Sequence, residues 1–412
     1  MKNAGRMALA VWGLLLCQTL GGCSAREFLT EIPRDYALAG GEAVQEQVVI
    51  QTEEQAGTQP ERESFLEEGV WRYAYGTMTE AEAVWYRDME KILGRFGEKE
   101  RLSGEGLAMG LTGEDISRIF QCVMNDHPEL FYVDGYSYVT YTRGETLTGI
   151  EFSGNYNVDY ETALNRRAEI REAAEEALEG ISPEASDYEK VRYVYEWVIT
   201  STDYNLEAAD NQNIYSVFIN HSSVCQGYAK AAQYLLNSLG VDCTLVQGTV
   251  YTGERHGWNL VKVDGSFYYM DTTWGDASYR MEETEEGRRQ GMPEVSYEYL
   301  NITTEELLRT HTPDEQLSVP ECTAWEANYY RREGAAFSEY DREQLQALAD
   351  KAMAQGQTSI TMKCLDAWCY EEMSGALIEG QEIFRYLEPD GGSVAYARNE
   401  RQLSLTFWVT NQ

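Results

Sequence analysis

The chain has 412 residues, enough for two or three compact domains, and 43% of them are hydrophobic. Its formal net charge is −36, and so acidic a surface repels phosphates and anionic lipid. These values argue against nucleic acid as a partner and against a basic face that docks on membranes. A solvated acidic exterior explains the charge, and a preference for basic protein partners is the alternative.

The N-terminal stretch MKNAGRMALAVWGLLLCQTLGGC has the pattern of an export signal. Two basic residues precede an apolar run that is too short for a comfortable transmembrane helix, and the run ends in LGGC, which resembles a bacterial lipobox. We therefore predict a lipoprotein signal peptide over residues 1–22 and lipidation of Cys23, with an ordinary cleaved signal peptide as the alternative. The protein is then exported and held on the extracellular side of the cell membrane by this anchor alone. Residues 23–62, rich in Glu, Gln and Gly, predict a flexible tether.

Residues 63–158 predict a small α+β domain. Apolar residues recur at helical spacing in TEAEAVWYRDMEKILGRF (79–96) and again in the stretch from residue 112 to His127, where the following proline should end the second helix. Alternating residues over 135–154, with a turn at Arg143-Gly144, predict a hairpin.

Residues 159–320 predict a second domain, which begins with a charged helix over 159–178. Ser186 and Glu189 have the spacing of a capping box at the start of the next helix, and a loop over 201–222 follows.

A third unit is predicted over residues 325–412. It combines a helix (338–355), a strand (358–363), a second helix (366–378) and a terminal hairpin around Asn399-Glu400. The predicted fold class of the whole chain is α+β.

The stretch NHSSVCQGYAKAAQYLLNSLG places a cysteine at the start of a helix. Ser223 and Gln226 have capping-box spacing, so Cys225 falls in the first turn, and Gly240 ends the helix. Free N–H groups and the positive end of the helix dipole favour a thiolate there and offer donors to an oxyanion. This position alone leaves four roles open for the thiol: a buried hydrophobe, half of a disulfide, a metal ligand or a nucleophile.

The other cysteines are widely spread and show no CxxC pairs, which is typical neither of a disulfide scaffold nor of a zinc ribbon. Cys364 and Cys369 could pair or remain buried free thiols, and Cys243 is predicted to be a core residue. Since the chain has no HxH or HExxH motif either, we predict no metal and no cofactor.

A histidine and an aspartate are brought together by a predicted hairpin. The Asp-Gly pair at 264–265 connects two apolar runs, so Val263 should oppose Ser266. In that register Asp271 opposes Trp258, which shares a sheet face with His256. His256 and Asp271 are then diagonal neighbours on one face, within reach of each other.

The three other histidines have simpler predicted places. His127 ends a helix, His221 lies in the loop before the cysteine helix and could line a cleft, and His311 is expected at the surface.

Together, SVCQGYAKAAQYLLNSLGV and HGWNLVKVDGSFYYMDTTWGD resemble the transglutaminase-like superfamily of papain-related Cys-His-Asp enzymes, closely over 185–280. The flanks DHPELFYV and YEYLNITTEELLRTHTP are similar to those of its bacterial members. Gly257 stands where alanine is common, which should not affect the chemistry. Nothing resembles the calcium-binding loops of animal transglutaminases, so calcium is not implied.

The resemblance implies a nucleophile helix packed on an antiparallel sheet, with Cys225 as nucleophile, His256 as general base and acid, and Asp271 as the orienting carboxylate. The oxyanion would be held by the Cys225 N–H and by a second donor, for which Gln212 and Tyr215 are the candidates. The candidate cleft residues, some of which could equally pack in the core, are Tyr228, Trp258, Asn259 and Trp274.

The leading hypothesis is an extracellular, membrane-anchored thiol enzyme that acts on protein or peptide amides, cell-wall peptides among them. A Cys225 thioester would pass its acyl group to an amine or to water, and the sequence does not choose between them. The alternative is a surface binding or assembly module that uses the same fold without catalysis.

Overall fold

A computed structural model describes residues 25–29 by their backbone, and residues 62–67, 70–143, 146–276, 292–315, 317–387 and 393–410. The predicted signal peptide and Cys23 lie outside these ranges. The chain divides into two compact units, a larger one that includes residues 62–276 and 294–333 and a smaller one that includes 334–412. Within the described ranges, no helix combines the length and the apolar character needed to cross a membrane.

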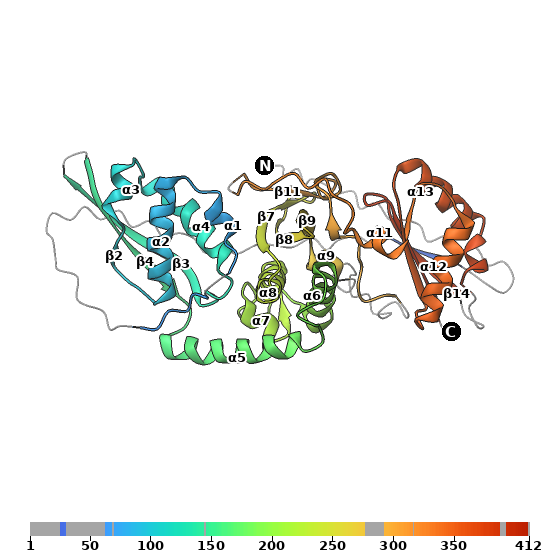
Figure 1. Ribbon diagram of the computed structural model, residues 1–412, viewed down its shortest axis with the longest axis horizontal. Coiled ribbons are helices and arrows are strands. Elements are labelled where there is room, and N and C mark those ends of the chain that lie inside the picture. Colours follow the sequence, from blue (N-terminus) through green and yellow to red (C-terminus); the bar gives the residue numbers. More distant parts are fainter. Residues whose placement is uncertain are drawn as a thin grey trace, which may run out of the picture. The chain divides into compact units, whose positions relative to one another are not determined.

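The N-terminal part of the larger unit packs helices against a small sheet of strand order β2-β4-β3 (Figure 1). Its elements are α1 (Tyr73–Gly76), α2 (Glu80–Gly94), β2 (Glu100–Arg101), α3 (Gly104–Ala108), η1 (Gly113–Asp115), α4 (Ile116–Asp126), β3 (Val133–Arg143) and β4 (Thr146–Tyr156). Thr79 begins α2 with a capping box to Glu82, which satisfies two N–H groups at the helix start. The predicted hairpin is confirmed, since Arg143 pairs with Thr146 across its turn.

The central part of the larger unit forms an antiparallel sheet of order β10-β9-β8-β7-β11, against which α8 packs on β7 and β8 (Figure 1). Its elements are α5 (Tyr160–Leu178), α6 (Asp187–Ser201), β5 (Asp203–Tyr204), α7 (Ile214–Phe218), β6 (Ser222–Ser223), α8 (Cys225–Ser238), β7 (Cys243–Val250), β8 (Arg255–Val263), β9 (Ser266–Met270), α9 (Thr272–Gly275), β10 (Leu300–Ile302), α10 (Thr304–Leu307), β11 (His311–Pro313) and α11 (Tyr329–Glu333). The mixed α+β class and the nucleophile-type helix on an antiparallel sheet are as predicted.

One hydrophobic core runs through both parts of the larger unit. Trp85 of α2, Val194 of α6 and Leu235 of α8 are all fully buried in it. Residues 63–158 and 159–320, which the sequence pattern separates into two domains, therefore contribute side chains to the same core. Gln233 of α8 also joins the two parts by a hydrogen bond, because its Nε2 donates to the carbonyl oxygen of Asn125 at 2.7 Å.

The smaller unit has a mixed sheet of order β1-β14-β15-β13-β12. Its elements are β1 (Ala25–Leu29), β12 (Ala336–Phe337), α12 (Arg342–Ala354), β13 (Ser359–Cys364), α13 (Ala367–Ser374), the π-helical turn η2 (Gly375–Glu379), η3 (Glu382–Arg385), β14 (Ser393–Asn399) and β15 (Ser404–Thr410). Strand β1 pairs in parallel with β14, although it lies in the segment where a tether is predicted. Cys364 and Cys369 are buried free thiols, the second of the two alternatives.

A buried charge network closes the C-terminal end of α4. Nδ1 of His127 lies 2.7 Å from Oε1 of Glu129, and its Nε2 lies 3.2 Å from Oε1 of Glu90, which also pairs with Arg72 at 2.6 Å. Burial disfavours the charged ring, but Glu129 and Glu90 outweigh burial and raise the pKa of His127 to about 9. The ring is therefore a cation held between two carboxylates at neutral pH.

This network predicts a pH dependence of stability. Because the pKa of His127 is raised on folding, its stabilisation is complete below the unfolded value near 6.5 and is lost as pH rises through about 9. We expect the loss to be about 3 kcal/mol between these limits. Urea unfolding of the wild type and of His127→Gln from pH 6 to 10 measures it: the variant should be less stable at pH 6, with a flatter profile. The exposed His221→Gln is the matched control, and an equally steep profile in His127→Gln would contradict the assignment.

Candidate active site

Helix α8 begins at Cys225, as predicted, but without the predicted capping box. Its N-cap is Val224, which offers no side-chain cap, because the hydroxyl of Ser223 is turned away to the preceding loop. There Ser223 Oγ donates to the carbonyl oxygen of Asn211 at 2.8 Å and lies 2.6 Å from Ser216 Oγ. The first-turn N–H groups of α8 therefore have no capping hydroxyl from the N-cap residue.

The predicted β8–β9 register is confirmed. Val263 opposes Ser266, and the pairing continues in step to Asn259 opposite Met270. Asp271 then leaves the strand as the N-cap of α9, where its Oδ1 accepts the backbone N–H of Trp274 at 3.0 Å. This cap fixes the carboxylate so that its other oxygen points back to the sheet.

The structure brings Cys225, His256 and Asp271 together. Oδ2 of Asp271 lies 2.8 Å from Nε2 of His256, and Cys225 lies near enough to the same imidazole to raise its pKa. Because Nε2 is engaged by the carboxylate, Nδ1 is the ring nitrogen left for the thiol. The three side chains are almost inaccessible, with exposed fractions of 2%, 3% and 1%.

The charges of the three groups are set by one another. Burial alone would lower the pKa of His256, but Asp271 and Cys225 outweigh burial and raise it to about 10. Burial likewise opposes ionisation of Asp271, yet His256 and His311 hold the pKa of its carboxyl well below its usual range. At neutral pH the site therefore holds an imidazolium between a carboxylate and Cys225.

His311 is not at the surface, and that prediction is wrong. It is 1% exposed on the edge strand β11, which pairs with β7, and its Nε2 lies 3.1 Å from Oδ2 of Asp271. Forty residues separate it from Asp271 in the chain, and its strand is too short to show a period. The only sequence signal was its place in the flank that resembles the bacterial relatives.

The other predicted site residues are the four cleft candidates and the two oxyanion candidates. Tyr228, Trp258, Asn259 and Trp274 are all buried, so none of them lines an open cleft. Trp258 and Trp274 lie 6.0 and 5.9 Å from the His256 ring, measured between ring centroids. Tyr228 donates from its hydroxyl to the carbonyl oxygen of Thr202 at 2.6 Å.

The two oxyanion candidates differ in place. Gln212 directly follows Asn211, whose carbonyl oxygen accepts the N–H of Val224 at 3.1 Å, so its loop lies against the start of α8. Its side-chain oxygen is buried and has no hydrogen-bond partner within the described ranges. Tyr215 instead donates from its hydroxyl to Glu169 of α5 at 2.9 Å, which engages it away from the thiol. His221 is exposed, with its Nδ1 3.1 Å from the carbonyl oxygen of Ser201.

His256, Asp271 and His311 have ligand atoms within 4.8 Å of one another, a spacing that could suit a metal ion. However, the Nε2–Oδ2 distances of 2.8 and 3.1 Å are those of direct hydrogen bonds. The atoms that would coordinate an ion thus already contact each other.

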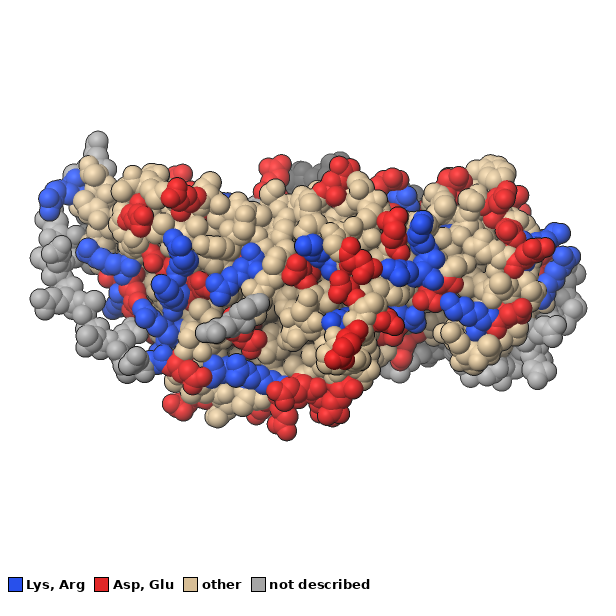
Figure 2. Space-filling model, viewed as in Figure 1, with Lys and Arg blue, Asp and Glu red and all other residues tan. Residues whose placement is uncertain are grey.

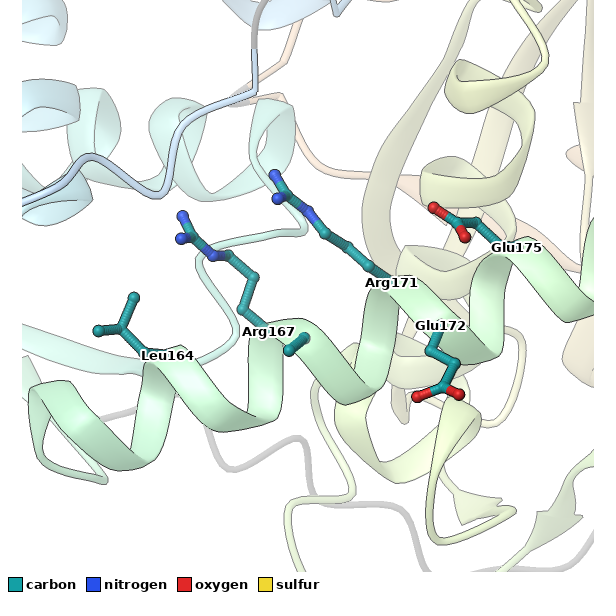
Figure 3. Close-up of a pocket in the computed structure, with 6 residues that line it drawn as sticks. Leu164, Arg167, Arg171, Glu172 and Glu175 are labelled. Atoms are coloured by element: carbon teal, nitrogen blue, oxygen red, sulfur yellow. The ribbon is translucent and has the colours of Figure 1, made fainter.

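A hollow on the surface lies along α5 and contains none of these residues (Figure 3). Arg167 and Arg171 line it and point to one side of the helix, where they pair with Glu63 at 2.7 Å and Glu67 at 3.4 Å. Acidic side chains gather over the C-terminal half of α5 (Figure 2). Since its arginines are paired within the chain, the hollow has no free charge to offer an anion.

Comparison with protein families matches the part of the chain that contains Cys225, His256 and Asp271. Residues 174–272 match the model of the Transglutaminase-like superfamily, a range that contains Cys225, His256 and Asp271. The core of this protein is transglutaminase-like.

Individual relatives are distant. Kyphoscoliosis peptidase of Mus musculus is 27% identical over 123 residues, which is 26% of this chain and 19% of the peptidase, and the Homo sapiens protein is 26% identical over 106 residues. The chain thus spans about a fifth of the mouse relative's length. A solved TGase shares 15% identity at a TM-score of 0.26, over 39% of this chain and 56% of the TGase. The periplasmic domain of TgpA from Pseudomonas aeruginosa shares 16% at a TM-score of 0.21, over 32% and 57%.

The geometry predicts selective alkylation of Cys225. Burial raises the pKa of Cys122 to about 11 and that of Cys322 to about 12, so these thiols stay protonated near pH 7. We expect limiting iodoacetamide to label Cys225 about tenfold faster than the other described cysteines, because only Cys225 has an imidazolium partner. His256→Ala should remove this preference. Mass mapping of the labelled peptides measures it, and slow, uniform labelling of all thiols would contradict a Cys225–His256 pair.

Proposed function

We propose that the protein is a cysteine-dependent acyl-transfer enzyme acting on carboxamide or peptide bonds of protein substrates. The observation that supports this most is the 2.8 Å hydrogen bond from His256 to Asp271, on an imidazole whose pKa the neighbouring Cys225 also raises. A core thiol requires neither partner, whereas an activated thiolate requires a base and a group that orients the base.

The reaction begins when the Cys225 thiolate attacks the substrate carbonyl carbon and its π electrons move to oxygen. The raised pKa of His256 means that the ring already carries the proton that the leaving amine needs. When the tetrahedral intermediate collapses, the C–N bond breaks, His256 gives this proton to the nitrogen, and a thioester remains. The neutral imidazole then accepts a proton from the incoming amine or water, which attacks the thioester and releases the thiolate.

The oxyanion of this intermediate needs two donors. The backbone N–H of Cys225 is one, since N–H groups in the first turn of a helix have no partner within that helix. For the second we propose the side-chain NH2 group of Gln212, because its loop lies against the helix start.

Shielding of the thioester favours transfer to an amine over hydrolysis. With Cys225 and His256 only 2% and 3% exposed, bulk water reaches the reacting carbon poorly. An amine that is delivered with a bound substrate does not depend on that access. We therefore place cross-linking or amine incorporation ahead of proteolysis.

The test of this function uses a glutamine-containing protein and a fluorescent primary amine. We expect amine incorporation by the wild type, its loss in Cys225→Ala, and a fall of about a hundredfold in Gln212→Ala, the typical cost of one oxyanion donor. Cys243→Ala, which removes another buried thiol, is the matched control and should retain activity. If the wild type neither incorporates the amine nor releases ammonia or peptides, the non-catalytic binding module becomes the better description.

We also propose that the protein is exported and held at the membrane by a lipid on Cys23, so that its protein or peptide substrates are extracellular. The support is the LGGC sequence after a short apolar run. In cell fractionation, the wild type should sediment with membranes and Cys23→Ala should be released. Retention of Cys23→Ala on the membrane would show that another segment anchors the chain.

A further inference from the structure

We propose that His311 is a positioning residue of the active site: as a second, neutral imidazole, it donates a hydrogen bond to Asp271 and holds that carboxylate in line with His256. This inference rests on the proposed function and extends it to a residue outside the 174–272 range that matches the family model. Its basis is the contact of two imidazoles with one carboxylate oxygen, at 2.8 Å from His256 and 3.1 Å from His311.

The tautomer of His311 follows from its two hydrogen bonds. Its Nε2 faces a carboxylate oxygen, which only accepts, so Nε2 carries a proton. Its Nδ1 lies 2.8 Å from Oγ1 of Thr310, and the Tyr299 hydroxyl lies 3.1 Å from that Oγ1. In a neutral ring Nδ1 accepts the hydroxyl proton of Thr310, for which the Leu307 carbonyl oxygen is a more distant acceptor at 3.4 Å, and the Thr310 oxygen can accept from Tyr299. These groups form a chain of donors directed at Asp271.

Packing holds this arrangement in place. Trp258 and Trp274 contact the His311 ring, with centroid distances of 4.9 and 4.5 Å, and Tyr299 lies 5.5 Å away. The ring is buried, so it cannot leave the carboxylate without displacing an indole.

The titratable groups that face His311 are Asp271, His256 and Tyr299. Burial, reinforced by the charge on His256, lowers the pKa of His311, while Asp271 and the Leu307 carbonyl act in the opposite direction. Asp271 thus accepts hydrogen bonds from one charged ring, His256, and from one neutral ring, His311. The neutral ring supplies a hydrogen bond without competing for the negative charge on which the His256 cation depends.

The test measures the alkylation rate of Cys225 by iodoacetamide from pH 5 to 9, which needs no identified substrate. His311→Met removes the donor and keeps most of the volume, whereas His311→Gln keeps an N–H donor. With one donor fewer, Asp271 holds the His256 cation less firmly beside Cys225, so the acid side of the profile should move to higher pH in His311→Met. We expect its rate at pH 6 to fall about tenfold, the effect of one hydrogen bond to a charged group. His311→Gln should stay within about threefold of the wild type.

The controls separate positioning from packing. His127→Gln alters another buried histidine held by carboxylates and should leave the pH profile unchanged. Thr310→Val keeps His311 but removes the hydroxyl at Nδ1, and it should shift the profile in the same direction by a smaller amount. Near-UV circular dichroism and thermal unfolding identify variants that fold, and if His311→Met does not, the Thr310→Val profile decides.

Two results would overturn the inference: a His311→Met profile identical to that of the wild type, or equal losses in His311→Gln and His311→Met. An unshifted Thr310→Val profile would do so where His311→Met does not fold. These outcomes differ from failure of the proposed function, in which the wild-type Cys225 itself is not labelled selectively.

Discussion

The site depends on a buried carboxylate whose polar groups are all engaged. Asp271 donates its backbone N–H to the carbonyl oxygen of Tyr299 at 3.0 Å, and its Oδ1 accepts from the Trp274 N–H. Its Oδ2 meets His256 and His311. A buried charge without such partners would cost several kcal/mol, so the sheet, helix α9 and strand β11 are all needed for Asp271 to be buried and ionised at the same time. Folding and activation of the thiol are therefore coupled through this residue.

Close approach of α8 to its surroundings is the second requirement. A Cβ on Gly227 would lie 2.0 Å from Ser223 Oγ, so only glycine fits where the loop meets the helix start. On the sheet side, Asn259 donates to the carbonyl oxygen of Ala229 at 2.9 Å and ties α8 to β8. Gly257 has no such constraint, since an added Cβ would make ordinary contacts of 3.5 Å or more. The alanine that is common there would fit equally well.

Most of the correct predictions came from local sequence patterns. The site residue that was missed depends on a long-range contact. The Asp-Gly turn set the β8–β9 register, and through it the His256–Asp271 pair, because a hairpin needs only neighbouring residues. Helix periodicity placed Cys225 in the first turn of α8, but the capping box failed since Ser223 serves a tertiary contact instead. His311 could not be found in this way, because a three-residue edge strand brings it to Asp271 from a distant part of the chain.

The burial of Cys225 also limits the rate at which its thiol is oxidised. Peroxides oxidise the thiolate form of cysteine, first to a sulfenic acid and then irreversibly to a sulfinic acid. With 2% of the residue exposed, an oxidant meets the sulfur only during the local opening that also admits a substrate. Oxidation of Cys225 is thereby tied to the frequency of local opening, and a closed molecule is protected. Burial therefore slows the oxidation of Cys225 as well as access to the site.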